Sequence, residues 1–166
     1  QDPYKGNASA DVIVVEFFDP NCPACRAMHP IMKQAVDAHG DEAMFVYKPV
    51  PLWGYSVPQI EALFVAAEQN KFFAMLDAQF ARQQRGGLGE SGMRAVAQAI
   101  GMDADRLIDQ IKGGAYRQQV LQQREQAVAA GFTAAPTVLV NGRFVSNQSR
   151  TPRCMSAFIE AAKAEG

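Results

Sequence analysis

The sequence predicts an α/β fold, and three observations support this expectation. The residue pattern predicts a strand over residues 12–18 that leads directly into a helix, and a second strand after that helix. A long block of helical periodicity comes next, and beyond it lie two short strands and a last helix. The expected order is therefore strand, helix, strand, helical block, hairpin, helix.

The first part of the chain contains two expected strands and the helix between them. Residues 12–18 are β-branched and aromatic, which is typical of a buried strand, whereas the polar residues 1–10 predict an extended lead-in. A Pro-containing turn ends the strand, and a helix is expected over about 22–38. Residues 43–48 alternate well enough to predict the second strand.

The second part of the chain is expected to be helical and then to form a hairpin. Helical spacing of apolar residues covers about 58–131, with its clearest break at the glycines of 86–89. Residues 136–140 and 143–145 are joined by Asn-Gly, which predicts a hairpin with a type I′ turn. Thr151 and Pro152 are expected to start the final amphipathic helix.

Composition limits the classes of function. The 166 residues are 48% hydrophobic and 20% charged, which predicts one globular domain with a sizeable core. A net charge of -1 predicts no nucleic-acid partner. No apolar run approaches the roughly 20 residues of a membrane span, and no signal-peptide core is present. Gln1 is compatible with a mature N-terminus left after cleavage of a signal peptide.

The segment Cys22-Pro23-Ala24-Cys25 is where the chemistry is expected. Cys22 would lie at the start of the helix, with Pro23 at the first helical position, where a missing backbone N–H costs nothing. The unpaired N–H groups and the positive end of the helix dipole would favour the thiolate of Cys22. Cys25 would lie one turn further in and deeper, as suits a thiol that closes a disulfide with Cys22.

These features together resemble the DsbA-like thiol-disulfide oxidoreductases of the thioredoxin superfamily. The resemblance covers about residues 6–159 and includes the helical block between the second strand and the hairpin. The motifs Val-Glu-Phe-Phe-Asp at 15–19, Pro-Val-Pro-Leu at 49–52 and Ala-Pro-Thr-Val-Leu-Val-Asn-Gly at 135–142 are most similar to the periplasmic subgroup that includes ScsC and Com1. The resemblance implies a single domain with a thioredoxin core of about 11–57 and 132–166 and a helical insertion of about 58–131.

The resemblance also implies a role for individual residues. Cys22 matches the attacking cysteine and Cys25 the resolving one, in agreement with the dipole reasoning. Pro136 matches a cis-proline that places Ala135 beside the sulfurs, where its backbone can pair with an extended substrate. Glu16 matches a buried acid beneath the cysteines that could relay a proton, since burial raises the pKa of a carboxyl group.

Further residues complete the expected site. Lys48, at the end of the second strand, is the expected partner of the acid, and Pro23, Ala24, Ala135 and Pro136 are the expected substrate contacts. The strongest oxidant of the family has Pro-His between its cysteines, so Pro-Ala here predicts a less oxidising pair. Larger members of the subgroup carry an N-terminal oligomerisation segment, and only about ten residues precede the first strand here, which predicts a monomer.

The function expected from the resemblance is disulfide exchange with unfolded or partly folded exported proteins in the periplasm, as a dithiol oxidase. No cofactor is expected, and a membrane redox partner is expected to reset the cysteine pair. Two other functions stay open: a disulfide reductase or isomerase, and a protein that binds a soft metal such as copper through the same thiols. Apolar surface for the substrate is expected from Trp53, Leu52 and Met28.

Several residues also have a purely structural interpretation. Cys22 and Cys25 could form a structural disulfide, and Pro136 could be an ordinary trans proline. Glu16 could face solvent, because strand alternation permits it, and Lys48 could extend into solvent. Cys154 is expected to be an unreactive core thiol, with a third redox thiol as the alternative.

Overall fold

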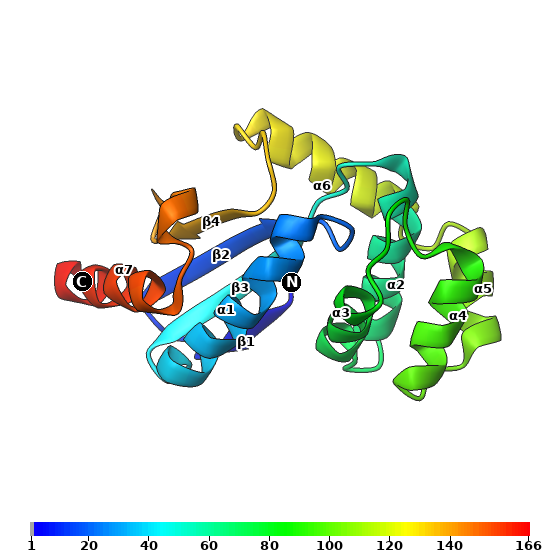
Figure 1. Ribbon diagram of the computed structural model, residues 1–166, viewed down its shortest axis with the longest axis horizontal. Helices are drawn as coiled ribbons and strands as arrows, with labels where there is room; N and C mark the ends of the chain where they lie inside the picture. The colour runs from blue at the N-terminus through cyan, green and yellow to red at the C-terminus, as the bar shows by residue number, and fades with distance from the viewer. Residues whose placement is uncertain (1) are drawn as a thin grey trace. The chain divides into compact units, whose positions relative to one another are not determined.

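The computed structural model describes residues 2–166 and confirms the expected α/β class. It contains a five-stranded sheet and seven α-helices within those residues (Figure 1). The strands are β1 (Tyr4–Gly6), β2 (Val12–Phe18), β3 (Ala43–Pro49), β4 (Thr137–Val140) and β5 (Arg143–Phe144). The α-helices are α1 (Pro23–His39), α2 (Val57–Ala67), α3 (Phe72–Ala81), α4 (Gly89–Ala99), α5 (Ala104–Lys112), α6 (Arg117–Ala129) and α7 (Pro152–Glu165), and the short 3-10 helices are η1 (Gly54–Ser56) and η2 (Asn147–Ser149).

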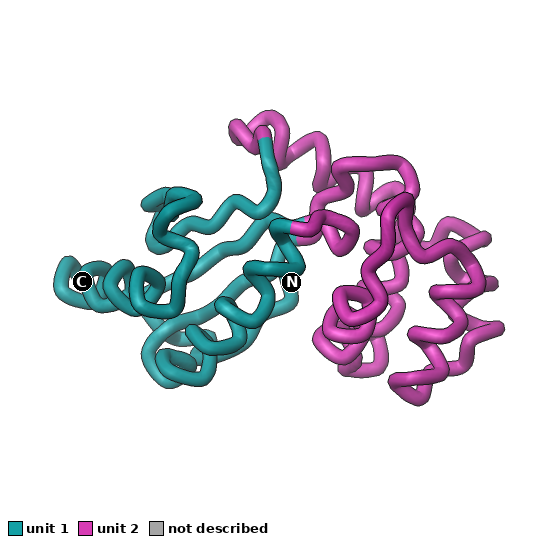
Figure 2. Tube along the Cα trace, in the orientation of Figure 1, with its two compact units in different colours: residues 1–18, 24–48, 134–166 teal, residues 19–23, 49–133 magenta. Residues whose placement is uncertain are grey.

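The chain divides into two compact units, shown in Figure 2. The first consists of residues 1–18, 24–48 and 134–166 and contains the sheet, α7 and all of α1 except its first residue, Pro23. The second consists of residues 19–23 and 49–133 and contains α2 to α6. The short segment 19–23 therefore groups with the helices, although the strand before it and the helix after it belong to the other unit.

The sheet of the first unit has the strand order β1-β3-β2-β4-β5. β4 runs antiparallel to both β2 and β5, and the predicted hairpin is confirmed. Asn141 and Gly142 both have positive φ angles, of 46° and 79°, as a type I′ turn requires. The lead-in contains a strand that the sequence did not predict, β1, which pairs with β3. Its residues are largely exposed and so show no strand pattern of buried apolar side chains.

Alternate residues of β2 form one buried face of the sheet, and Glu16 belongs to this face together with Val14 and Phe18. The Phe18 ring meets the ring of Tyr47 on β3 edge to face, with centroids 6.4 Å apart. Helix α1 buries a stripe of residues three or four apart, which is the spacing of one helix face. The residues of this stripe are Cys25, Met28, Met32, Ala35 and His39.

Helix α2 is the centre of the second unit, because nine of its eleven residues are buried. Two buried glutamines link it to its neighbours: Gln59 Nε2 donates to Gln79 Oε1 at 3.1 Å, and Gln59 Oε1 accepts from the N–H of Leu88 at 3.0 Å. Asp103 caps α5 by accepting from the N–H of Arg106 at 3.1 Å. Within residues 2–166, no helix has the length and the apolar character needed to cross a bilayer.

Candidate active site

The two cysteines lie next to each other at the start of α1. Cys22 directly precedes Pro23, the first residue of the helix, and Cys25 lies in the first helical turn. Both are buried, with exposed fractions of 5% for Cys22 and 0% for Cys25, whereas Pro23 and Ala24 are exposed. The order of burial agrees with the expectation that Cys25 is the deeper thiol.

Asp19 holds the segment that leads from β2 to the cysteines. Its side chain is fully buried, and its Oδ1 accepts from the N–H of Asn21 at 2.7 Å and from Oγ of Ser56 at 2.9 Å. Its Oδ2 accepts from the N–H of Leu52 at 2.7 Å. Asn21 Nδ2 also donates to Ser56 Oγ at 3.0 Å. This network fixes the chain just before Cys22 on the loop that follows β3.

Burial of the Asp19 carboxyl group disfavours its charged form. Burial raises the pKa of Asp19, although the hydrogen bonds from Leu52, Asn21 and Ser56 oppose that rise. Sequence reasoning placed Asp19 within a family motif and gave it no role. A carboxyl group in the short connection between a buried strand and a helix was the one signal that pointed to it.

Glu16, the expected acid, and Lys48, its expected partner, both belong to the first unit. Glu16 is 3% exposed, so the alternative in which it faces solvent is wrong. Lys48 is half-buried, and its Nζ donates to Asp2 Oδ2 at 2.8 Å, a partner that the sequence did not suggest. The role of Glu16 and Lys48 as a proton-relay pair stays a prediction.

Ala135 and Pro136 lie at the start of β4. The bond between them is cis, which is the isomer that the resemblance implies. Arg150 Nη2 donates to the carbonyl oxygen of Pro136 at 2.6 Å, and Thr137 Oγ1 donates to that of Ala134 at 2.6 Å. The backbone on both sides of the proline is therefore anchored within the first unit.

The apolar surface expected around the site is only partly available. Trp53 is 39% exposed and its ring stacks on Tyr55, with centroids 5.5 Å apart. Leu52 is half-buried, but Met28 is 1% exposed, so the expectation that Met28 offers surface is wrong. Met28 lies on the buried stripe of α1, and helical periodicity decides this placement.

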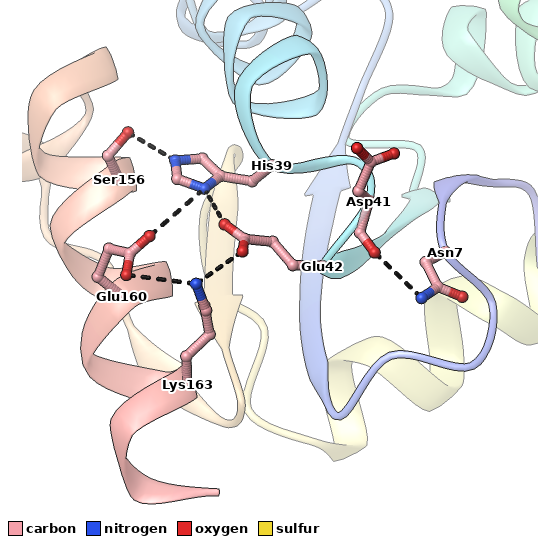
Figure 3. Close-up of polar contacts among 7 residues, drawn as sticks. All are labelled: Asn7, His39, Asp41, Glu42, Ser156, Glu160 and Lys163. Carbon is pink, nitrogen blue, oxygen red and sulfur yellow. Dashed lines mark hydrogen bonds and ion pairs between the residues drawn. The ribbon is translucent and has the colours of Figure 1, made fainter.

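A different cluster has the composition of a metal site. His39, Glu42 and Glu160 offer ligand atoms within 4.8 Å of one another (Figure 3). The ammonium group of Lys163 already lies among them, with Nζ 2.6 Å from Glu42 Oε2 and 3.4 Å from Glu160 Oε2. His39 Nδ1 is 2.7 Å from Glu42 Oε1, and Nε2 is hydrogen-bonded to Ser156 at 2.8 Å. This cluster ties α7 to the end of α1.

Comparison with known families places the chain. A family model described as Thioredoxin matches residues 1–161. The chain belongs to the thioredoxin family. In this thioredoxin-family chain, the paired cysteines at the start of α1 and the cis-proline at the start of β4 lie where the resemblance to DsbA-like proteins placed them.

Solved structures of other proteins share the fold of this thioredoxin-family chain. A thioredoxin-like oxidoreductase from Silicibacter pomeroyi is 27% identical, with a TM-score of 0.84 over 98% of this chain and 92% of that one. DsbA from Chlamydia trachomatis gives a TM-score of 0.85 at 17% identity, covering 99% and 92%. A linker-deletion mutant of ScsC from Proteus mirabilis gives 0.78 at 15% identity, covering 99% and 75%. The DsbA-like form of the thioredoxin fold is thereby confirmed.

The curated relatives are much longer proteins. A Na(+)/H(+) antiporter NhaA from Herminiimonas arsenicoxydans is 28% identical over 98% of this thioredoxin-family chain, which covers 26% of the antiporter. The chain therefore spans about a quarter of the length of the curated relatives it matches.

Proposed function

We propose that this chain is a protein thiol-disulfide oxidoreductase that oxidises dithiols of exported proteins through Cys22 and Cys25. The observation that carries the proposal is the placement of Cys22 directly before α1 and of Cys25 in its first turn, in a thioredoxin-family chain. The first N–H groups of a helix have no partner within it, and they stabilise an anion placed just before them. Cys22 holds that position, so it is the proposed nucleophile and leaving group.

The proposed reaction is two successive exchanges at sulfur. A substrate thiolate attacks Sγ of Cys22 in the oxidised pair, the bond between Cys22 and Cys25 breaks, and Cys25 leaves as a thiolate. A second substrate thiolate then attacks the substrate sulfur of this mixed disulfide, and Cys22 leaves. The substrate loses two electrons and two protons and gains a disulfide, and the cysteine pair is reduced to two thiols.

Glu16 is the proposed proton donor for the thiolate of Cys25. Both residues belong to the first unit and both are buried, so proton exchange of Cys25 with bulk water is hindered. A carboxyl group held in such surroundings can deliver the proton that Cys25 needs when it leaves. Lys48 is placed at the end of β3 and is proposed to tune this acid through its charge.

Substrate contacts are proposed at the exposed residues of the cysteine turn and at the start of β4. Pro23 and Ala24 present exposed surface, and the backbone of half-buried Ala135 is proposed to pair with an extended chain, held there by the buried Pro136 beside it. A hollow of about 240 Å³ in the second unit could hold an apolar side chain. It is lined by Pro51, Leu52, Trp53, Gly54, Val57, Leu121 and Arg124.

The proposed location is the periplasm, with unfolded or partly folded exported proteins as substrates and a membrane redox partner that reoxidises the pair. The resemblance to the periplasmic subgroup with ScsC supports this part of the proposal. A reductase or isomerase would use the same residues with the pair reduced at the start. Copper binding would need only the two thiols.

Mixing the oxidised protein with a reduced, unfolded disulfide protein tests the proposal directly. We expect the free thiols of the substrate to fall by two for each cysteine pair reduced, as counted with a thiol reagent. The matched control is the double variant Cys22→Ser with Cys25→Ser, which should leave the substrate thiols unchanged. Loss of disulfides from an oxidised substrate mixed with the reduced protein, without loss of thiols in the first mixture, would show a reductase. No exchange in either mixture, together with tight Cu(I) uptake by the reduced protein, would replace the enzyme by a metal carrier.

A further inference from the structure

One glutamine from the second unit holds the backbone on both sides of Asn21. Gln83, which follows α3 along the chain, is half-buried and donates from Nε2 to two carbonyl oxygens. The acceptors are the carbonyl groups of Pro20 at 3.0 Å and of Cys22 at 2.9 Å. A single amide nitrogen has two hydrogens, so one side chain can satisfy both carbonyls at once.

With this contact, both backbone polar groups of Cys22 are engaged. Its N–H donates to the carbonyl oxygen of Asp19 at 3.0 Å, within the turn, and its carbonyl accepts from Gln83. The other end of the turn is fixed by the buried Asp19 side chain on Leu52 and Ser56. The segment 19–22 is therefore held from two sides by residues of the helical unit.

The reactivity of a cysteine that directly precedes a helix depends on its position relative to the N–H groups of the first helical turn. The stabilisation that helix N–H groups give to an anion falls off within the first turn, so a change in the backbone at Cys22 weakens it. Each carbonyl oxygen near a thiolate also repels it, and a hydrogen bond to that oxygen reduces the repulsion. Gln83 influences both the backbone position of Cys22 and the repulsion from the carbonyl oxygens. It does so through the backbone and need not touch the sulfur.

We propose that Gln83 is a positioning residue for the nucleophilic cysteine: it keeps Cys22 at the start of α1 and neutralises the carbonyl groups of Pro20 and Cys22. This inference rests on the proposed function and assigns a determinant of its rate. A glutamine is suited to the task because it is neutral and its amide can donate twice. A side chain that cannot donate removes this donor from both carbonyls and releases the turn on this side.

The test replaces Gln83 by methionine, which has a similar length and no donor. The parent protein carries Cys25→Ser and Cys154→Ser, so that Cys22 is the only thiol. The pH profile of its alkylation by iodoacetamide is then measured, together with thermal unfolding. We expect Gln83→Met to move the profile to higher pH and to slow alkylation about three- to tenfold on the rising limb, since a tenfold loss of thiolate corresponds to one pH unit.

The neighbouring glutamine provides a matched control. Gln84 Nε2 donates to the carbonyl oxygen of Gly87 at 2.9 Å, inside its own loop, so Gln84→Met should leave the profile of Cys22 unchanged. Gln83→Glu is a second test variant that keeps the size of the side chain. Its carboxylate cannot donate and repels the carbonyls, and we expect a larger shift than with methionine.

The inference is overturned if Gln83→Met and Gln83→Glu both alkylate as the parent protein does. A loss of folding in the methionine variant would leave the glutamate variant and its profile to decide. Alkylation uses a small reagent and no protein substrate, so the result does not depend on the proposed oxidase activity. A protein that fails to oxidise dithiols and still shows the expected shift would overturn the proposed function alone.

Discussion

Phe17 of β2 lies opposite Thr137 of β4, and Thr137 directly follows the cis bond between Ala135 and Pro136. Because the two strands are antiparallel, the next step of this register brings the end of β2 level with Pro136. The chain continues from the end of β2 into the segment that carries Cys22. The start of β4 therefore lies at the same end of the sheet as the end of β2, from which the cysteine segment continues.

Replacing Cys25 by serine is expected to trap a mixed disulfide through Cys22. Without the deeper thiol, the bond between Cys22 and a substrate sulfur cannot be resolved in the reductive direction. Non-reducing gel electrophoresis and mass spectrometry of the linked peptide should place the link at residue 22. If the Cys22→Ser protein is the one that accumulates the linked species, the assigned roles of the two cysteines are reversed.

Changing Glu16 to glutamine is expected to slow the steps in which Cys25 gains or loses a proton. A general acid or base contributes at least about a hundredfold to such a step, and we expect a loss of tenfold or more in dithiol oxidation. Alkylation of Cys22 in a Cys25→Ser background serves as the control, since it bypasses Cys25. Equal slowing of both reactions would contradict a role for Glu16 at Cys25.

Removing the buried carboxyl of Asp19 is expected to destabilise the protein. Asp19→Ala leaves the N–H groups of Asn21 and Leu52 and the hydroxyl of Ser56 without their acceptor, at a cost of about 2–4 kcal/mol in the free energy of unfolding. Asp105, an exposed aspartate of the same unit, is the control, and Asp105→Ala should leave the urea midpoint nearly unchanged.

The effect of Asp19 should also depend on pH. A carboxyl whose folded-state pKa is raised stabilises the protein fully below its unfolded pKa, ordinarily 3.8, and this gain disappears as pH rises through the folded value. The difference between the wild type and Asp19→Ala is therefore expected to be larger in acid than at neutral pH. Urea titrations at several pH values would show a constant difference if Asp19 had its ordinary pKa.

The cluster at the end of α1 predicts the opposite dependence. The hydrogen bond with His39 and the contact with Lys163 lower the pKa of Glu42 below its ordinary 4.5. A carboxyl with a lowered pKa stabilises the protein above the unfolded value, and this contribution is lost as pH falls through the folded value. Glu42→Gln should flatten the loss of stability below about pH 5, whereas Glu165→Gln, which removes a more exposed ion pair, should change it less.

Two glycines with positive φ angles should differ in their tolerance of alanine. A Cβ at Gly142 would meet no atom within 4 Å, so Gly142→Ala costs only the strain of its φ angle of +79°, about 1 kcal/mol. A Cβ at Gly6 would lie 2.3 Å from the carbonyl oxygen of Ala43, which forces the backbone apart. Denaturant unfolding should show a clearly larger loss for Gly6→Ala, and similar losses would mean that β1 is not held against β3.

Local patterns in the sequence determined most of the regular elements and where the two cysteines lie relative to them. The run 12–18, the Asn-Gly turn before residue 143 and the break at 86–89 each appear in the structure as predicted, because alternation, turn residues and glycine act within a few residues. The same local rules put Cys22 before a helix and Cys25 in its first turn. The boundaries expected for the core and for the insertion at 58–131 stay a prediction.

The tertiary structure alone decided which polar side chains meet. Asp19 accepts from Leu52, 33 residues away, Lys48 pairs with Asp2 across 46 residues, and Gln83 reaches Cys22 across 61. Sequence periodicity does not predict such contacts, because they depend on how strands and helices pack after they have formed. The residues that hold the cysteine segment in place could therefore be found only once the chain was folded.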